Sequence, residues 1–145
     1  MTEVIYIAHA TATGGRNRHS ETDDGTLKFS LASPGTTEEK TDSANPEQLF
    51  ACAYAACFGS ALEFAAKQQG IVLNKPEVHA DIALNKNEDG FFLGATLNIA
   101  LPGIEKDQAE KLVQAAHQVC PYSKATRGNI EVVLKVNEQS LQAAA

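Results

Sequence analysis

The chain has 145 residues, enough for a sizeable core, and we expect residues 1–145 to form a single domain. Its 43% hydrophobic and 21% charged residues argue against a disordered or fibrous protein. Eighteen acidic residues against twelve basic ones give a net charge of -6, which argues against a nucleic-acid partner. Residues 1–12 show no secretory signal pattern, so we expect a cytoplasmic protein.

The first part of the chain predicts two strands separated by a loop. Residues 4–13 are rich in β-branched and small side chains and predict a strand that ends at the pair Gly14-Gly15. The polar residues 16–25 predict a loop, and residues 26–31 predict a second strand. A further loop is expected over residues 32–44.

A long helix is predicted over residues 46–69. Asn45 is a good N-cap, Pro46 suits the first helical position, and Gly70 marks the end. Residues 49–66 are apolar or small almost throughout, so the helix is apolar on all sides and has to be covered on most of them. A single chain of this size has few elements with which to cover it. We therefore expect a dimer interface along this helix.

The same helix is not expected to cross a membrane. Its apolar and uncharged stretch, residues 49–62, has fourteen residues. A bilayer needs about twenty apolar residues in a row. The stretch therefore predicts a buried helix.

The second half of the chain predicts a hairpin, a helix and a last strand. Alternating apolar side chains predict strands over residues 77–84 and 91–101, with a turn over residues 85–90. Residues 104–119 predict an amphipathic helix ended by Pro121, and residues 129–136 a strand, followed by a frayed tail after Asn137. Strands and helices do not alternate regularly, which predicts an α+β fold.

Three cysteines are the candidates for chemistry. Cys52 and Cys57 are five residues apart on one predicted helix, about 140° apart around the axis and roughly 7.5 Å along it. That separation lies outside disulfide geometry. Cys57 and Cys120 lie on different predicted helices, which a fold can bring together. The simplest alternative is that these cysteines are small buried hydrophobic residues.

A reactive Cys57 needs help from elsewhere in the fold. It lies three turns inside an apolar helix, where burial raises the pKa of a thiol. Its thiolate therefore requires a nearby cation. Arg16 and Arg18, which follow the glycine pair, are the candidates, although arginines in a polar loop are often solvated surface residues.

Two long segments around the cysteines carry a family resemblance. The first is Asn45-Pro46-Glu47-Gln48-Leu49-Phe50-Ala51 with Tyr54-Ala55-Ala56-Cys57-Phe58, and the second is Ala115-Ala116-His117-Gln118-Val119-Cys120-Pro121-Tyr122-Ser123. Together they resemble the organic hydroperoxide resistance proteins, the Ohr branch of the Ohr/OsmC superfamily. With Ala10-Thr11-Ala12-Thr13-Gly14-Gly15-Arg16 near the start and Leu101-Pro102-Gly103 before the second helix, the resemblance covers nearly the whole chain.

The resemblance implies a fold and a set of site residues. The fold is an intertwined α+β homodimer with antiparallel sheets around central apolar helices and active sites at the dimer interface. Cys57 is then the peroxidatic thiol, Cys120 the resolving thiol, Arg16 the residue that stabilises the thiolate, and Glu47 the residue that orients Arg16. Glu47 and Cys57 are about 15 Å apart along one continuous helix. If both contact Arg16, the helix is broken or one group comes from the other chain.

The resemblance also implies the reaction. Cys57 reduces an organic hydroperoxide to an alcohol and becomes a sulfenic acid, which condenses with Cys120 to a disulfide. A dithiol of the dihydrolipoamide type, carried on lipoylated proteins, then reopens the disulfide, and no metal or bound cofactor is needed. Phe58, Phe91 and Phe92 are candidates for favouring alkyl and fatty hydroperoxides over hydrogen peroxide.

The sequence departs from the usual Ohr pattern at three places. Asn17-Arg18-His19 stands where Asp-Gly-Arg is usual and the loop is one residue shorter, which leaves open whether Arg16 or Arg18 contacts the thiolate. Cys52 replaces the usual alanine, which we interpret as a conservative core substitution. Lys124 stands where asparagine is usual, with little expected consequence.

Other functions fit the sequence less well. The four histidines and three cysteines lack the short spacing of zinc ligands. A hydrolase that uses Cys57 with His117 or His79 lacks an evident orienting group. The main alternative outside catalysis is a dimeric module that binds apolar ligands, and the closest alternative is the sister OsmC branch with different substrate preferences.

Overall fold

The computed structural model describes residues 1–35 and 42–141. The chain divides into two compact units, Met1–Leu49 and Phe50–Ala145, and each is described by itself. The first unit is a small sheet, and the second holds the long helix and a larger sheet. Part of the loop predicted over residues 32–44 lies outside the described residues.

The first unit is a four-stranded sheet in the order β1-β2-β3-β4. Its strands are β1 (Ala10–Thr13), β2 (His19–Thr22), β3 (Lys28–Leu31) and β4 (Ser43–Ala44). The first three are antiparallel, whereas β3 and β4 are parallel. A single 3₁₀ turn, η1 (Gly15–Asn17), connects β1 to β2.

Two predictions for this unit were wrong in detail. The strand predicted over residues 4–13 begins only at Ala10, because no described strand of the chain pairs with residues 4–9. The loop predicted over residues 16–25 contains β2. Its turn to β3 is fixed by Thr22, whose hydroxyl donates to Asp24 (2.6 Å) and whose carbonyl accepts from Gly25 N–H (2.9 Å).

The long helix α1 (Pro46–Gln68) has the predicted bounds to within one residue. Asn45 and Gln48 form a reciprocal capping box, since Gln48 N–H donates to Asn45 Oδ1 (2.9 Å) and Asn45 N–H donates to Gln48 Oε1 (3.0 Å). Gly70 has φ +68°, the left-handed conformation that ends helices. The predicted start and end signals are thus confirmed.

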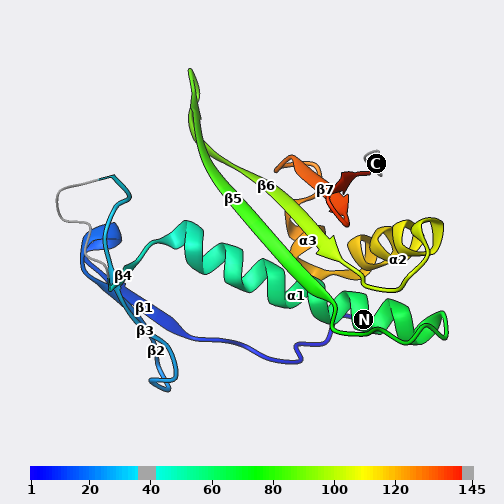
Figure 1. Ribbon diagram of the computed structural model, residues 1–145. Helices are drawn as coiled ribbons and strands as arrows, with labels where there is room; N and C mark the ends of the chain where they lie inside the picture. The colour runs from blue at the N-terminus through cyan, green and yellow to red at the C-terminus, as the bar shows by residue number, and fades with distance from the viewer. Residues whose placement is uncertain (36–41, 142–145) are drawn as a thin grey trace. The chain divides into compact units, whose positions relative to one another are not determined.

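The larger sheet runs in the order β5-β6-β7-β8 (Figure 1). The strands β5 (Glu77–Asn87) and β6 (Gly90–Ala100) form a long hairpin, and β7 (Val132–Val136) pairs with β6 in parallel. The hairpin turn is shorter than predicted, because pairing continues to Asn87 and Gly90. The strand β8 (Gln139–Ser140) pairs with β7 where a frayed tail was predicted.

Two helices cross from β6 to β7. The helix α2 (Lys106–Val119) starts two residues later than predicted, because Glu105 is its N-cap and accepts from Asp107 N–H (3.0 Å). The short helix α3 (Pro121–Thr126) was not predicted. Pro121 ends α2, as expected, but also occupies the first turn of α3, where its missing N–H is tolerated.

The strand predicted over residues 129–136 begins at Val132 because the preceding backbone closes α3. The N–H groups of Asn129 and Ile130 both donate to Thr126 O, at 3.0 and 2.8 Å. The observed mixture of helices and sheets confirms the α+β class, although each sheet contains one parallel pair.

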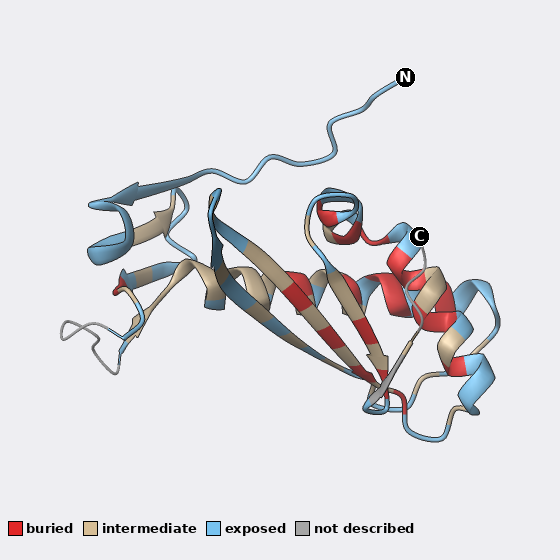
Figure 2. Ribbon diagram, turned by 90° about the horizontal axis from the view of Figure 1, so that it is seen from above, coloured by how far each residue is buried: buried red, intermediate tan, exposed pale blue. Residues whose placement is uncertain are grey.

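The core of the second unit lies between α1, the sheet and α2 (Figure 2). Its fully buried apolar side chains are Tyr54, Phe58, Leu62, Leu97, Ile99, Leu101, Leu112 and Val113. By length and composition α1 is apolar enough to cross a membrane. Its buried side nevertheless packs into this core, as the core helix of a globular unit does.

One side of α1 stays uncovered in the single chain. Cys52, Ala56 and Ser60 are exposed along it, and Phe64 is 55% exposed. The helix was predicted to be apolar all round and covered on most sides. The chain itself covers only the face that carries Tyr54, Phe58 and Leu62.

Replacing Phe58 by alanine should strongly destabilise the protein, because its side chain is 0% exposed. We expect a loss of about 3–5 kcal/mol in the free energy of unfolding, measured by urea denaturation at one protein concentration. The matched control is Phe91→Ala, since Phe91 is 71% exposed and should cost below about 1 kcal/mol. Equal losses in the two variants would contradict this description of the core.

Candidate functional site

Cys57 and Cys120 lie in contact within the second unit. Their sulfur atoms are 3.7 Å apart, with the Cys120 thiol directed at Cys57 Sγ. Both cysteines are free, Cys57 is half-buried, and Cys120 is fully buried. A disulfide requires a sulfur separation of about 2.0 Å, so a small movement is enough to link them. The structure therefore brings together the two thiols singled out in the sequence.

The junction between α2 and α3 positions Cys120. Its N–H donates to Ala116 O (2.9 Å), which closes the last turn of α2. Its side chain is the N-cap of α3, with Sγ accepting from Ser123 N–H at 3.5 Å. Cys120 is thus held from both sides by backbone hydrogen bonds, although its own backbone is extended.

The surroundings of Cys57 disfavour its thiolate in the single chain. Burial raises the pKa of the Cys57 thiol, and the neighbouring Cys120 raises it further. The backbone of Tyr122 acts in the opposite direction and lowers the pKa of this thiol. The expectation that this thiol needs a cation is consistent with these causes.

Arg16 and Glu47 form a bidentate ion pair within the first unit. Arg16 Nη1 donates to Glu47 Oε2 (2.9 Å) and Nη2 donates to Oε1 (2.7 Å). These bonds lower the pKa of Glu47 and raise the pKa of Arg16. The Arg16 side chain remains 43% exposed, against 11% for Glu47. The pair therefore presents an oriented guanidinium that another group can still approach.

The turn that carries Arg16 depends on two glycines. Gly14 and Gly15 have φ values of +74° and +59°, which side chains rarely adopt. A Cβ on Gly14 would also lie 2.5 Å from Arg18 Cγ. The side chain of Ser33 donates to Asn17 Oδ1 (3.1 Å) in the same turn. These features shape the turn from which Arg16, the first of the two candidate arginines, pairs with Glu47.

A buried polar network, which was not predicted, lies beside Cys120. Ser123 Oγ lies 2.9 Å from His117 Nδ1 and 3.0 Å from the Tyr54 hydroxyl, which is 3.2 Å from Thr126 Oγ1. Burial, followed by the charge of Arg127, lowers the pKa of His117. His117 Nδ1 thus contacts Ser123, and this contact does not support a hydrolase in which His117 is the base for Cys57. These residues lie in the cysteine motifs, but spacing alone gave no sign of their contacts.

Aromatic rings pack around the same junction. Tyr54 stacks on Tyr122 with ring centroids 5.8 Å apart, and Phe50 meets both rings edge-on at 6.0 and 5.9 Å. Of the phenylalanines considered for substrate preference, Phe58 is fully buried in the core, whereas Phe91 and Phe92 are exposed on the hairpin. Phe50 and Tyr122 are therefore the better candidates for an apolar surface at the site.

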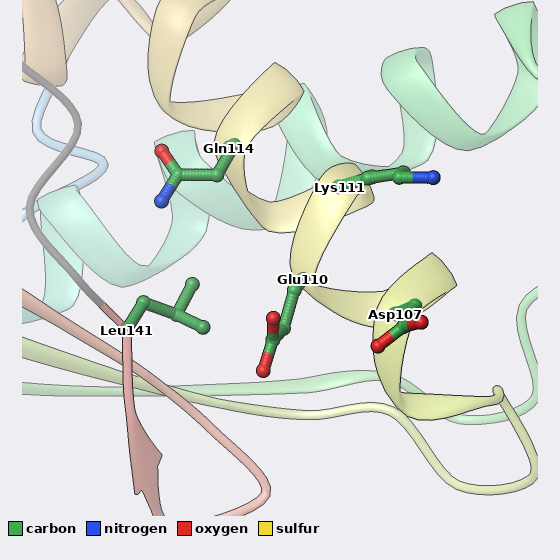
Figure 3. Close-up of a pocket in the computed structure, with 5 residues that line it drawn as sticks. All are labelled: Asp107, Glu110, Lys111, Gln114 and Leu141. Carbon is green, nitrogen blue, oxygen red and sulfur yellow. The ribbon is translucent and has the colours of Figure 1, made fainter.

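A hollow beside α2 and the third cysteine, Cys52, are weaker candidates for a site than the thiol pair. A hollow beside α2 is lined by Asp107, Glu110, Lys111, Gln114 and Leu141 and contains no sulfur (Figure 3). Among residues 1–35 and 42–141, no three His, Cys, Asp or Glu side chains gather as potential metal ligands. Cys52 is exposed on α1. The contact between Cys57 and Cys120 remains the arrangement most suited to chemistry.

Comparisons with known proteins agree with the motifs. The family model described as OsmC-like protein matches residues 37–135. The chain is 46% identical to organic hydroperoxide resistance protein OhrB of Bacillus subtilis over 91% of this chain and 98% of that protein. The chain belongs to the OsmC-like family, in its organic hydroperoxide resistance branch.

Solved structures support the same assignment. The crystal structure of Bacillus subtilis OhrB has a TM-score of 0.87, 44% identity, and covers 92% of this chain and 99% of that one. An Ohr structure from Vibrio cholerae has a TM-score of 0.89, 41% identity, and covers 96% of each chain. The family predicted from the two cysteine motifs is thereby confirmed.

Replacing Arg16 by glutamine should raise the pKa of the Glu47 carboxyl towards about 4.3, its ordinary value. In the native protein the pair's stabilisation is complete above that value and is lost as the pH falls through the lower folded-state pKa. A carbon-detected NMR titration of Glu47 measures the shift. Arg18→Gln is the matched control and should leave the Glu47 pKa low; the reverse pattern would assign the pair to Arg18.

Proposed function

We propose that this Ohr protein is a cysteine-based peroxidase that reduces organic hydroperoxides to alcohols and serves in defence against oxidative stress. The observation that carries the proposal is the 3.7 Å contact between Cys57, which is half-buried, and Cys120, which is fully buried. The names of relatives as organic hydroperoxide resistance proteins support the class of substrate.

In the first step, the Cys57 thiolate attacks the outer oxygen of the hydroperoxide. A sulfur–oxygen bond forms and the oxygen–oxygen bond breaks, so that Cys57 is oxidised to a sulfenic acid and the substrate is reduced. The leaving alkoxide takes a proton and departs as an alcohol. Cys57 suits this step better than Cys120, because Cys120 is fully buried.

In the second step, Cys120 attacks the sulfur of the Cys57 sulfenic acid. The sulfur–sulfur bond forms, the sulfur–oxygen bond breaks, and hydroxide leaves with the thiol proton as water. The contact between the reduced sulfurs supports this step, because only a small movement is required. The disulfide also protects Cys57 from further oxidation.

In the third step, an external dithiol reopens the disulfide. We propose a dihydrolipoamide-type dithiol, presented on a lipoylated protein, which becomes a cyclic disulfide as both cysteines are reduced. One thiolate of the reductant forms a mixed disulfide and its second thiol displaces the protein. The protein itself then requires no metal or bound cofactor.

Arg16 is the proposed partner of the Cys57 thiolate, and Glu47 orients it. The bidentate pair supports this, since it holds a guanidinium that remains partly exposed. Because α1 is unbroken between Glu47 and Cys57, ten residues place them about 15 Å apart along the helix axis. We therefore propose that the cation for each thiol comes from the second chain of a homodimer.

The uncovered surfaces of the single chain support dimerisation. One side of α1 exposes small side chains and Phe64, and the N-terminal arm exposes Val4, Ile5, Tyr6 and Ile7. Apolar surface of this extent is unusual on a monomer and marks an interface. An intertwined homodimer with α1 near its centre would cover it.

The site also suggests a preference for bulky apolar peroxides. Phe50 packs edge-on against Tyr122, which lies two residues after Cys120. Aromatic surface favours alkyl or fatty acid hydroperoxides over hydrogen peroxide through burial of the apolar chain. A cytoplasmic location, where reducing thiols are abundant, suits a catalytic disulfide.

The reduced wild-type protein should consume cumene hydroperoxide rapidly with dihydrolipoamide as electron donor and consume hydrogen peroxide much more slowly. Cys57→Ser should abolish turnover, whereas Cys120→Ser should allow one oxidation without recycling through the disulfide. Cys52→Ser is the matched control and should turn over like the wild type. Full turnover by Cys57→Ser would contradict the proposal.

A second outcome would point to a different function. If the wild type consumes no peroxide and all three thiols remain titratable, the chain is better described as a module that binds apolar ligands. A preference for hydrogen peroxide would instead favour the chemistry of the sister OsmC branch.

A further inference from the structure

We propose that the buried network of Tyr54, Ser123 and His117 positions Cys120 for attack on the oxidised Cys57. The inference rests on the proposed peroxidase function and concerns its second step. All three side chains are buried, at 0%, 0% and 6% exposed, and none touches solvent enough to serve as a substrate contact. They act through the backbone and side chain of Cys120.

The network connects the two segments that carry the sulfur atoms. Tyr54 lies one turn before Cys57 on α1, and Ser123 lies one turn after Cys120 on α3. Their hydroxyls are 3.0 Å apart. Ser123 also directs its backbone N–H to Cys120 Sγ. A hydrogen bond between Tyr54 and Ser123 therefore holds α1, which carries Cys57, and α3, which Cys120 caps, at a fixed separation.

The direction of the hydrogen bonds follows from counting protons. Thr126 Oγ1 donates to the Ser123 carbonyl at 3.2 Å, which uses its only proton. Thr126 must then accept from the Tyr54 hydroxyl, so Tyr54 must accept from Ser123 Oγ. Ser123 in turn accepts from His117 Nδ1–H. The chain thus runs one way, from His117 to Ser123 to Tyr54 to Thr126.

The reverse direction would leave Thr126 Oγ1 facing the Ser123 carbonyl oxygen without a proton between them, although that carbonyl also accepts from Arg127 N–H at 3.0 Å. The one-way arrangement keeps all four contacts and is therefore the direction that we infer. It requires the proton on His117 Nδ1 in the neutral ring. Arg127 holds the same residue from the other side, since its Nη2 donates to His117 O at 2.6 Å.

The chemistry of the second step explains why position matters. Cys120 must approach the Cys57 sulfur from the side opposite the departing hydroxide. Loss of alignment slows an intramolecular step steeply, and a displacement of about 1 Å can cost on the order of a hundred-fold. Loosening the network should therefore prolong the sulfenic acid. A second peroxide then oxidises Cys57 to the sulfinic acid, which the dithiol cannot reduce.

The test is a single-turnover experiment with reduced full-length protein and cumene hydroperoxide. Sulfenic acid is trapped with dimedone, the Cys57–Cys120 disulfide is quantified by mass spectrometry, and both are followed against time. Tyr54→Phe and Ser123→Ala should slow disulfide formation about ten-fold or more relative to sulfenic acid formation in the same variant. Both should also become sulfinic at lower peroxide doses than the wild type.

Matched controls remove a hydroxyl outside the network or change the donor at His117. Ser30→Ala deletes a hydroxyl from an exposed residue of β3 and should keep the wild-type ratio of the two rates. His117→Asn retains an N–H donor near the Nδ1 position and should preserve the ratio better than His117→Leu. If His117 had only a structural role, both variants would lower the stability of the protein, and the ratio of the two rates would not depend on an N–H donor at this position.

The proton position is measured independently in the wild type. The ¹⁵N chemical shifts of the His117 ring should show the neutral form protonated at Nδ1. A proton on Nε2, or wild-type ratios in both Tyr54→Phe and Ser123→Ala, would overturn the inference. Failure of the wild type to form a sulfenic acid would instead contradict the proposed function. If a Tyr54 or Ser123 variant fails to fold, two measurements still test the inference. They are the ¹⁵N shifts of the wild-type His117 ring and the comparison of His117→Asn with His117→Leu.

Discussion

The contact between Cys57 and Cys120 is the arrangement on which the proposed chemistry of this protein depends. The contact joins two separate segments, because Cys57 lies inside α1 and Cys120 lies in the extended junction between α2 and α3. The core shared by α1, the sheet and α2 brings the two segments together, and Tyr54 adds a hydroxyl contact and a stacked ring at the junction. The proposed redox function thus depends on the packing of the core.

Burial has opposite consequences for the two halves of the proposed mechanism. It shields Cys120 from direct oxidation, yet it raises the pKa of Cys57, whose thiolate is the attacking form. In the proposed mechanism, an oriented cation stabilises the Cys57 thiolate and so offsets the effect of burial on its pKa. The pair of Arg16 and Glu47 has the required geometry, and the unbroken α1 explains why we assign it to a second chain. In the proposed mechanism, activation of the Cys57 thiol therefore requires the dimer.

Local signals predicted part of the fold well. The capping box at Asn45 and the left-handed Gly70 bound α1 as the sequence indicated, and alternating side chains located the long hairpin. The errors occurred at short strands: β1 and β2 have four residues each and β8 has two, too few to show a clear alternation of side chains. The cysteine motifs identified the family and the thiols. The polar network stayed hidden because Tyr54 is distant in sequence from the other three residues and polar side chains usually indicate surface.

The most direct test of the central claim is a thiol count after one equivalent of organic hydroperoxide. The account predicts that the three free thiols of the reduced protein fall to one, with peptide mapping showing a Cys57–Cys120 disulfide and a free Cys52. Three remaining thiols, or a disulfide that includes Cys52, would contradict the assignment of Cys57 and Cys120 as the working pair.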